Sequence, residues 1–277
     1  GVEARPVDGS IGSSWDITPP AMLELGRRVD AELETADGVV VTHGTDTLEE
    51  TAAMLSFVLR TDAPVVLTGA MRPSLTPGAD GPANLRDALL VASSDDARGR
   101  GALVVFAGTI HRATSVAKVH SASLTAFQSP NSGPVGYVRE GRVSFMSNPL
   151  RPRHYEVTRA DAVVPLLTAV AGGSPRWVEA ALDGADGAVI AGMGLGHAPS
   201  SWLPLLGAAV GRGVPVVMAS RTGAGPTGGN YAGPGGDEDV RRQGLLSAGY
   251  RTPWCARIEL ICALAAGADP ADVFARD

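Results

Sequence analysis

Several features are scarce or absent in this 277-residue sequence. No apolar stretch approaches the ~20 residues that a membrane-spanning helix requires, so we expect no membrane span. The formal net charge is −6 and no run of basic residues occurs, which argues against a nucleic-acid-binding surface. The only cysteines, Cys255 and Cys262, are two helical turns apart. Since that spacing separates them by ~10 Å of rise, we expect no disulfide and interpret both as core residues.

Lysine is scarcer than cysteine. Lys118 is the single lysine among 23 basic residues, and all the others are arginine. An exposed surface position is the ordinary interpretation of a lysine. Arginine cannot give up its proton in a protein. A lone lysine in so arginine-rich a chain therefore favours a chemical role for Lys118.

The remaining composition, 44% hydrophobic and 19% charged, is sufficient for one large or two medium globular domains. In the first half, apolar β runs alternate with helical patterns. Strands are predicted at Val39–Val41, Val65–Thr68 and Leu103–Phe106, and helices at Leu48–Leu59 and Asn84–Ala92. This order predicts an α/β domain with a mostly parallel sheet flanked by helices. A hairpin is predicted around Arg139–Arg142.

A second, smaller α/β unit is predicted in the C-terminal part. We expect an N-terminal domain over residues 1–147 that carries most of the site, a linker over 148–162 and a C-terminal domain over 163–277. A long glycine-rich loop is predicted from Ser220 to Gly244, and loops of that length are usually functional or mobile. The predicted strands are Val163–Val170, Ala188–Ala191 and Val214–Ala219, and the predicted helices are Pro175–Leu182, Ser200–Val210 and Cys255–Ala265.

The turn after the first predicted strand is rich in polar groups. Residues 42–47 carry three hydroxyls, an imidazole and a carboxylate, at the strand end where ligands bind in open α/β sheets. Alternatively, Asp46 or Thr47 is only a helix N-cap, with Glu49 or Glu50 closing a capping box. Capping leaves the first four residues of the turn unexplained. We therefore favour a binding site for a polar substrate the size of an amino acid.

Several long motifs occur in order along the chain. They are Thr-His-Gly-Thr-Asp-Thr at residues 42–47 with Glu-Glu-Thr-Ala at 49–52, Thr-Gly-Ala-Met-Arg-Pro at 68–73, Asp-Gly-Pro-Ala-Asn-Leu at 80–85 and Gly-Pro-Val-Gly-Tyr at 133–137. With these motifs the chain resembles the bacterial L-asparaginases of the asparaginase/glutaminase family over nearly its whole length. The resemblance implies hydrolysis of L-asparagine to L-aspartate and ammonia through a threonine acyl-enzyme, without metal or organic cofactor. L-Glutamine is a second candidate substrate.

The resemblance also implies roles for individual residues. Thr45 and Asp46 match the threonine–aspartate pair of the family's site, and Lys118 matches the lysine that completes a catalytic triad. Ser14 matches the serine that holds the substrate α-carboxylate, and Ala70 a residue whose backbone carbonyl contacts the amide. A threonine hydroxyl is a poor nucleophile unless an adjacent base takes its proton. We expect Asp46 both to orient Lys118 and to pair with the substrate α-ammonium.

Other positions depart from the family or allow a simpler interpretation. Ser14 could merely cap a helix that begins near Pro19. Trp15 replaces what is often a glutamine, which would alter the tolerance for glutamine as substrate. His197 stands where many relatives have an asparagine that reaches into a neighbouring subunit's site, and the acidic contact beside it would come from Asp237 or Glu238. The family is usually homotetrameric, so we expect a homotetramer or homodimer whose subunits complete each other's sites.

The largest departure concerns the start of the chain. Family members begin with a strand ending in a Thr-Gly-Gly-Thr-Ile turn, whose first threonine is the primary nucleophile, followed by a loop with a catalytic tyrosine. Neither that turn nor that loop is present in this sequence, which begins just upstream of Ser14. We expect the complete protein to carry that segment and to be active, most simply in the cytoplasm, and the literal 277-residue chain to be inactive. Thr227–Asn230 resembles the turn but follows no apolar strand, so we reject it as a relocated nucleophile.

Two other functions remain open at this point. The chain could be a non-catalytic amino-acid-binding homologue if the N-terminal threonine is truly absent. It could also be the amidase subunit of a tRNA-dependent amidotransferase, although the acidic charge and the lack of an evident RNA-binding extension count against that. A dinucleotide site at Gly192–Gly196 is disfavoured, because the glycine spacing is wrong and the acidic residue expected ~20 positions later is missing.

Overall fold

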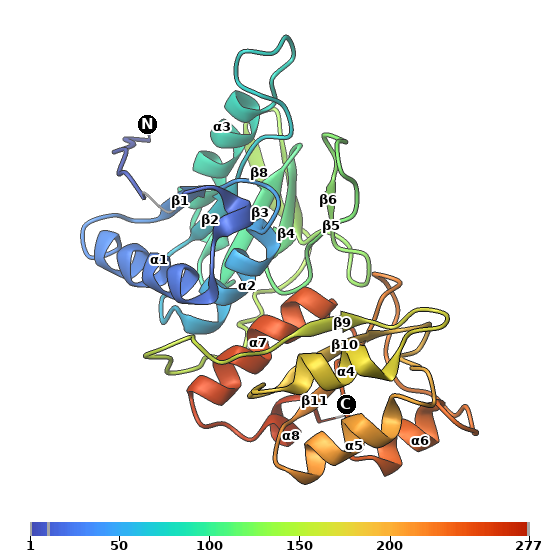
Figure 1. Cartoon of the computed structure of the whole chain (residues 1–277). Helices are drawn as coiled ribbons and strands as arrows, with labels where there is room; N and C mark the ends of the chain where they lie inside the picture. The colour runs from blue at the N-terminus through green and yellow to red at the C-terminus, as the bar shows by residue number, and fades with distance from the viewer. Residues whose placement is uncertain (1, 10–11, 276–277) are drawn as a thin grey trace. The chain divides into compact units, whose positions relative to one another are not determined.

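The computed structural model describes residues 2–9 and 12–275, and it divides the chain into two compact units (Figure 1). The first unit is Gly1–Tyr155 and the second is Glu156–Asp277. Each unit has its own sheet and its own helices. The predicted class, a two-domain α/β fold, is confirmed.

The sheet of the first unit has six strands in the order β1-β2-β3-β4-β7-β8. The first three pair in parallel and the others are antiparallel, so the sheet is mixed. The direction reverses after β3 because Ala107 and Gly108, both with positive φ, form a tight turn into β4. The predicted hairpin is confirmed, since Arg139 pairs with Arg142. The strands are β1 (Val39–Thr42), β2 (Val65–Thr68), β3 (Ala102–Phe106), β4 (Thr109–Arg112), β7 (Gly136–Arg139) and β8 (Arg142–Phe145).

Helices cover both faces of this sheet. The helices α1 (Pro19–Glu32) and α2 (Leu48–Val58) pack with one set of strand side chains, which includes Leu67. The helix α3 (Gly81–Ala92) packs with the alternate set, which includes Val66. Successive strand side chains point to opposite faces, so an unbroken apolar strand is buried on both sides.

The start of α1 decides one question from the sequence. Its N-cap is Thr18, whose hydroxyl accepts from the backbone N–H of Ala21 (3.4 Å), and prolines occupy the first helical positions. Ser14 instead lies in a separate 3₁₀ turn, η1 (Ser14–Asp16). A second such turn, η2 (Asp95–Ala97), precedes β3. The interpretation of Ser14 as the cap of this helix is therefore wrong.

A small ribbon carries the lysine. The strands β5 (Ala117–Lys118) and β6 (Phe127–Gln128) pair with each other outside the main sheet. The ring of Phe127 stacks on Phe106 of β3, with centroids 4.4 Å apart. This aromatic contact attaches the ribbon to the core beside the sheet.

The second unit has a four-stranded sheet, all parallel, in the order β12-β11-β10-β9. The helices α4 and α5 pack on one face of this sheet around the buried Trp202, and α7 contacts β10 and β11. The strands are β9 (Leu166–Thr168), β10 (Ala188–Gly192), β11 (Val216–Ser220) and β12 (Leu246–Ser247), and the helices are α4 (Pro175–Leu182), α5 (Leu203–Gly211), α6 (Asp237–Arg242), α7 (Pro253–Ala265) and α8 (Pro270–Val273).

Two predictions in this unit need correction. The strand predicted at Val163–Val170 is only three residues long, because its neighbour β10 pairs with Leu166–Thr168 alone. The predicted Ser220–Gly244 loop contains α6, whose acidic first turn and basic last turn suit a helix dipole. Cys255 and Cys262 are buried on α7, as expected. No helix among the described residues is long and apolar enough to cross a membrane.

Candidate active site

The polar turn lies where the sequence predicts it, at the carboxyl end of β1. The backbone N–H of His43 donates to the carbonyl oxygen of Thr68 (2.8 Å), which keeps the turn beside the end of β2. The next residue of β2's loop is Gly69. A Cβ there would lie 2.3 Å from the His43 carbonyl oxygen, so the close approach of the two loops requires glycine. The loop carrying Ala70 therefore begins directly beside the turn.

The ring of His43 holds the turn through hydrogen bonds on both of its nitrogens. Its Nδ1 lies 2.7 Å from the carbonyl oxygen of Gly44, and its Nε2 lies 3.0 Å from the hydroxyl of the fully buried Thr51. A carbonyl oxygen only accepts, so in the neutral ring Nδ1–H donates to Gly44 and Nε2 accepts from Thr51. Burial lowers the pKa of His43, which favours that neutral form. His43 thus fixes the backbone just before Thr45.

Three side chains meet at the top of the turn. The Lys118 ammonium donates to Thr45 Oγ1 (2.9 Å) and to Asp46 Oδ1 (3.0 Å). The Lys118 side chain is 15% exposed and that of Asp46 is 52% exposed, so the lysine is the more enclosed partner. Because Asp46 is half exposed, solvent screens this ion pair and reduces its contribution to stability. A lysine hydrogen-bonded to a threonine hydroxyl is positioned to exchange a proton with it.

The backbone of the same lysine is also held. Its N–H donates to Glu49 Oε2 (3.0 Å), in the first turn of α2. Burial raises the pKa of Glu49 to about 7; the bonded N–H and the Lys118 charge oppose the rise, and Glu50 adds to it. Both ends of Lys118 are therefore attached to the segment between Thr45 and Glu49.

Ser14 is brought to the same corner. Thr47 is the N-cap residue of α2, but its hydroxyl does not cap the helix and donates to the Ser14 carbonyl oxygen instead (2.6 Å). A Cβ on Gly44 would lie 2.4 Å from Ser14 Oγ, so the serine packs directly on the turn. Ser14 is buried, whereas the neighbouring residue Trp15 is 71% exposed. Capping by the Thr47 side chain is therefore not the explanation for this motif.

The loop after β2, which carries Ala70, is held by side-chain hydrogen bonds. Asp80 accepts from the backbone N–H groups of Met71 and Arg72 (2.9 Å each), directly after Ala70. Burial alone would raise the pKa of Asp80, but these N–H donors outweigh it and the pKa is lowered. The carboxylate thus fixes the chain on one side of Ala70.

Asn84 fixes the other side. Its amide N–H donates to the Gly69 carbonyl oxygen and to Asp80, and its oxygen accepts from the N–H of Ala107 (3.0 Å each). Asn84 is buried, so this bonding satisfies a polar side chain that would otherwise destabilise the core. Ala70 itself is exposed at the end of β2, with its flanking backbone held in place.

Comparison with known proteins decides the family. The model of the N-terminal asparaginase domain matches residues 8–151, and that of the glutaminase/asparaginase C-terminal domain matches residues 163–275. The chain belongs to the asparaginase family. The predicted resemblance is therefore confirmed over both units.

Individual relatives of this asparaginase-family chain agree. It is 40% identical to the probable L-asparaginase of Deinococcus radiodurans, over 93% of this chain and 80% of the relative. It is 34% identical to L-asparaginase 2 of Escherichia coli, over 95% of this chain and 76% of the relative. It is 38% identical to the glutaminase-asparaginase of Pseudomonas fluorescens, over 77% of this chain and 61% of the relative.

In the second unit of this family member, His197 has partners of its own. Its Nε2 lies 3.3 Å from Asp237 Oδ2, and its ring meets Tyr231 edge-on at 5.2 Å between centroids. Asp237 is buried and also accepts from the Tyr231 N–H (3.2 Å), whereas Glu238 is exposed. Of the two acidic candidates, Asp237 is the one bonded to His197.

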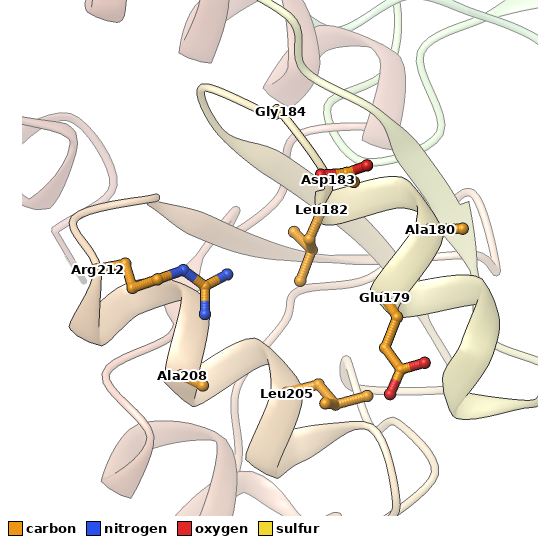
Figure 2. A pocket seen from close by; sticks show the side chains of 8 residues that line it. All are labelled: Glu179, Ala180, Leu182, Asp183, Gly184, Leu205, Ala208 and Arg212. Atoms are coloured by element: carbon orange, nitrogen blue, oxygen red, sulfur yellow. The ribbon is translucent and has the colours of Figure 1, made fainter.

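The second unit also has a shallow groove between α4 and α5 (Figure 2). Glu179 and Asp183 lie on the α4 side of it, and Arg212 follows α5. No site residue predicted from the sequence lines this groove. Within residues 2–9 and 12–275, no cluster of His, Cys, Asp or Glu side chains could hold a metal ion.

Sequence reasoning missed the supporting residues of the site. From the sequence, Glu49 is a candidate only for a capping box, and Asn84 stands only in a motif and at the start of a predicted helix. The position of Glu49 offered a signal: with Thr47 as N-cap, Glu50 is the third helical residue that a capping box uses, and Glu49 is not. The bond to Lys118 spans 69 residues, which no local pattern reveals.

Proposed function

We propose that this protein hydrolyses the side-chain amide of L-asparagine to L-aspartate and ammonia. The observation that carries the proposal is the hydrogen bond of 2.9 Å between the chain's only lysine and Thr45, with Asp46 on the same ammonium. The names of the relatives, L-asparaginase and glutaminase-asparaginase, support the same chemistry. They favour L-asparagine as substrate and L-glutamine as the competing one.

The proposed reaction has two half-reactions through a threonine ester. A threonine oxygen bonds to the amide carbon and loses its proton, the C–N bond breaks, and the nitrogen leaves as ammonia with a proton from the site. Water then adds to the ester and gives up a proton, the acyl–oxygen bond breaks, the threonine oxygen regains a proton, and L-aspartate leaves. The family resemblance implies that the acyl group is carried by the first threonine of the family's Thr-Gly-Gly-Thr-Ile turn. Thr45 and Lys118 move the protons, since a neutral lysine amine can accept one from the hydroxyl it contacts.

The first test is ammonia release from L-asparagine, with L-glutamine in parallel. It uses the complete protein as its source makes it, beside the 277-residue chain, each identified by intact mass. We expect release by the complete protein with neither tRNA nor a partner protein present. L-Asparagine binding without ammonia release by either form would contradict the proposal and favour the amino-acid-binding alternative. Release that requires tRNA would favour the amidotransferase alternative.

We propose further that two subunits complete each other's sites in a homodimer or homotetramer, with His197 making the contact that an asparagine makes in many relatives. Sedimentation at several concentrations measures the assembly. His197→Ala is expected to raise KM without changing sedimentation. If the protein is a fully active monomer, this part of the proposal is wrong.

Ser14→Ala tests the binding half of the site. We expect KM for L-asparagine to rise about tenfold or more with kcat nearly unchanged, since the substrate α-carboxylate would lose its charge-assisted hydrogen bond from the Ser14 hydroxyl. Steady-state kinetics of the complete protein measure both constants. Ser13→Ala, one position earlier, is the matched control and is expected to behave as wild type. An unchanged KM in Ser14→Ala would reduce Ser14 to a structural residue of η1.

A further inference from the structure

We propose that Glu49 is a positioning residue for the catalytic lysine: its carboxylate holds the Lys118 backbone where the side chain meets Thr45 and Asp46. This inference rests on the proposed function, because it gives Lys118 a catalytic role. It goes beyond that function in assigning a task to a residue that touches no reacting atom. The contact that carries it is the 3.0 Å hydrogen bond from Lys118 N–H to Glu49 Oε2.

The placement of Lys118 makes such an anchor useful. β5 is only two residues long, and within residues 2–9 and 12–275 its one strand partner is β6, through Ala117 with Gln128 and Lys118 with Phe127. A lysine side chain has many rotamers, so its amine is placed well only if its Cα is also fixed. The bond from Glu49 joins this short ribbon to α2, the helix that begins directly after the turn carrying Thr45.

The geometry forms a closed loop of contacts. Within five consecutive positions of the chain, Thr45 and Asp46 hold the lysine's ammonium and Glu49 holds its backbone. A shift of the ribbon relative to α2 would move the Lys118 amine away from Thr45. A misplacement of 1 Å near reacting groups can reduce turnover by about 100-fold.

The environment of Glu49 argues against a purely local role. Glu49 is partly buried. Removing a carboxyl from water is unfavourable unless it is hydrogen-bonded, and an apolar residue in the first turn of α2 would avoid that penalty. Burial raises the pKa of Glu49 to about 7, and the charged groups acting on it are Glu50 on the same turn and Lys118 on β5. Its oxygen accepts from a residue of another element, not from the N-cap of its own helix.

The experiment removes the acceptor and follows the anchor directly. Amide hydrogen exchange at Lys118 is measured by NMR in the complete protein labelled with [¹⁵N]lysine, and the signal is assigned by its loss in Lys118→Arg. Glu49→Ala removes the acceptor and Glu49→Gln keeps a neutral one. Glu50→Ala, the adjacent carboxyl, is the matched control. Should Glu49→Ala fail to fold, Glu49→Met, which fills similar volume without an acceptor, replaces it.

We expect exchange at Lys118 to accelerate at least about tenfold in Glu49→Ala and to stay near wild type in Glu49→Gln and Glu50→Ala. In ammonia-release assays we expect kcat to fall about tenfold or more in Glu49→Ala with KM nearly unchanged, and Glu49→Gln to recover most of it. Unchanged exchange in Glu49→Ala, or a loss appearing only in KM, would overturn the anchor. Accelerated exchange in a protein that hydrolyses no L-asparagine would support the anchor and overturn the proposed function.

Discussion

Lys118→Met is expected to reduce the turnover of L-asparagine by at least ~100-fold, as loss of a general base should. Methionine has nearly the length of lysine but carries no charge and no N–H group. It therefore removes the hydrogen bonds to Thr45 and Asp46 while filling the space. The backbone bond to Glu49 does not depend on the side chain and should keep the ribbon in place. Ammonia release by the complete protein measures the loss, and thermal unfolding checks that the variant is folded.

Lys118→Arg separates charge from proton transfer. Arginine keeps a positive charge near Asp46 but cannot give up its proton. If Lys118 acts as a base, the arginine variant loses turnover as severely as the methionine variant. If the lysine only neutralises Asp46, arginine should restore most of the activity, and wild-type turnover in Lys118→Met would exclude the triad altogether.

The same residue shows what the sequence could predict and why. Thr45, in the turn after β1, and Lys118 are 73 positions apart. From the sequence, only the family resemblance predicts that they belong to one site. The β1 turn itself was predictable from local rules, because three β-branched residues followed by an acidic helical start indicate a strand, a turn and a helix. Contacts between distant elements have no such local signature.

Some local patterns allow two interpretations or hide a short element. Thr47 lies at the N-cap of α2, yet its hydroxyl bonds Ser14, because η1 brings a carbonyl within reach. Ser220–Gly244 is so rich in glycine that the six-residue helix α6 was hidden among turn signals. The antiparallel half of the first sheet depends on the positive φ of Ala107, which alanine rarely adopts and composition does not indicate.

Asp46→Asn is expected to impair both substrate binding and turnover, because Asp46 is proposed to pair with the substrate α-ammonium and to orient Lys118. The side chain keeps its size but loses its charge, so the bond to Lys118 weakens and the substrate α-ammonium loses its partner. Charge-assisted bonds at about 1.5–3 kcal/mol predict a rise in KM of roughly tenfold or more, together with a fall in kcat. Asp37→Asn, the same change just before the amino end of β1, is the control and should leave both constants unchanged.

The two tasks can be separated by combining Asp46→Asn with Lys118→Met. Residues that act as a unit have non-additive effects, so the part of the kcat loss that runs through the lysine should vanish when the lysine is already gone. The rise in KM should persist, because the α-ammonium contact does not need Lys118. If instead the KM effect also vanished, Asp46 would act only on the lysine. The substrate ammonium would then have its partner elsewhere.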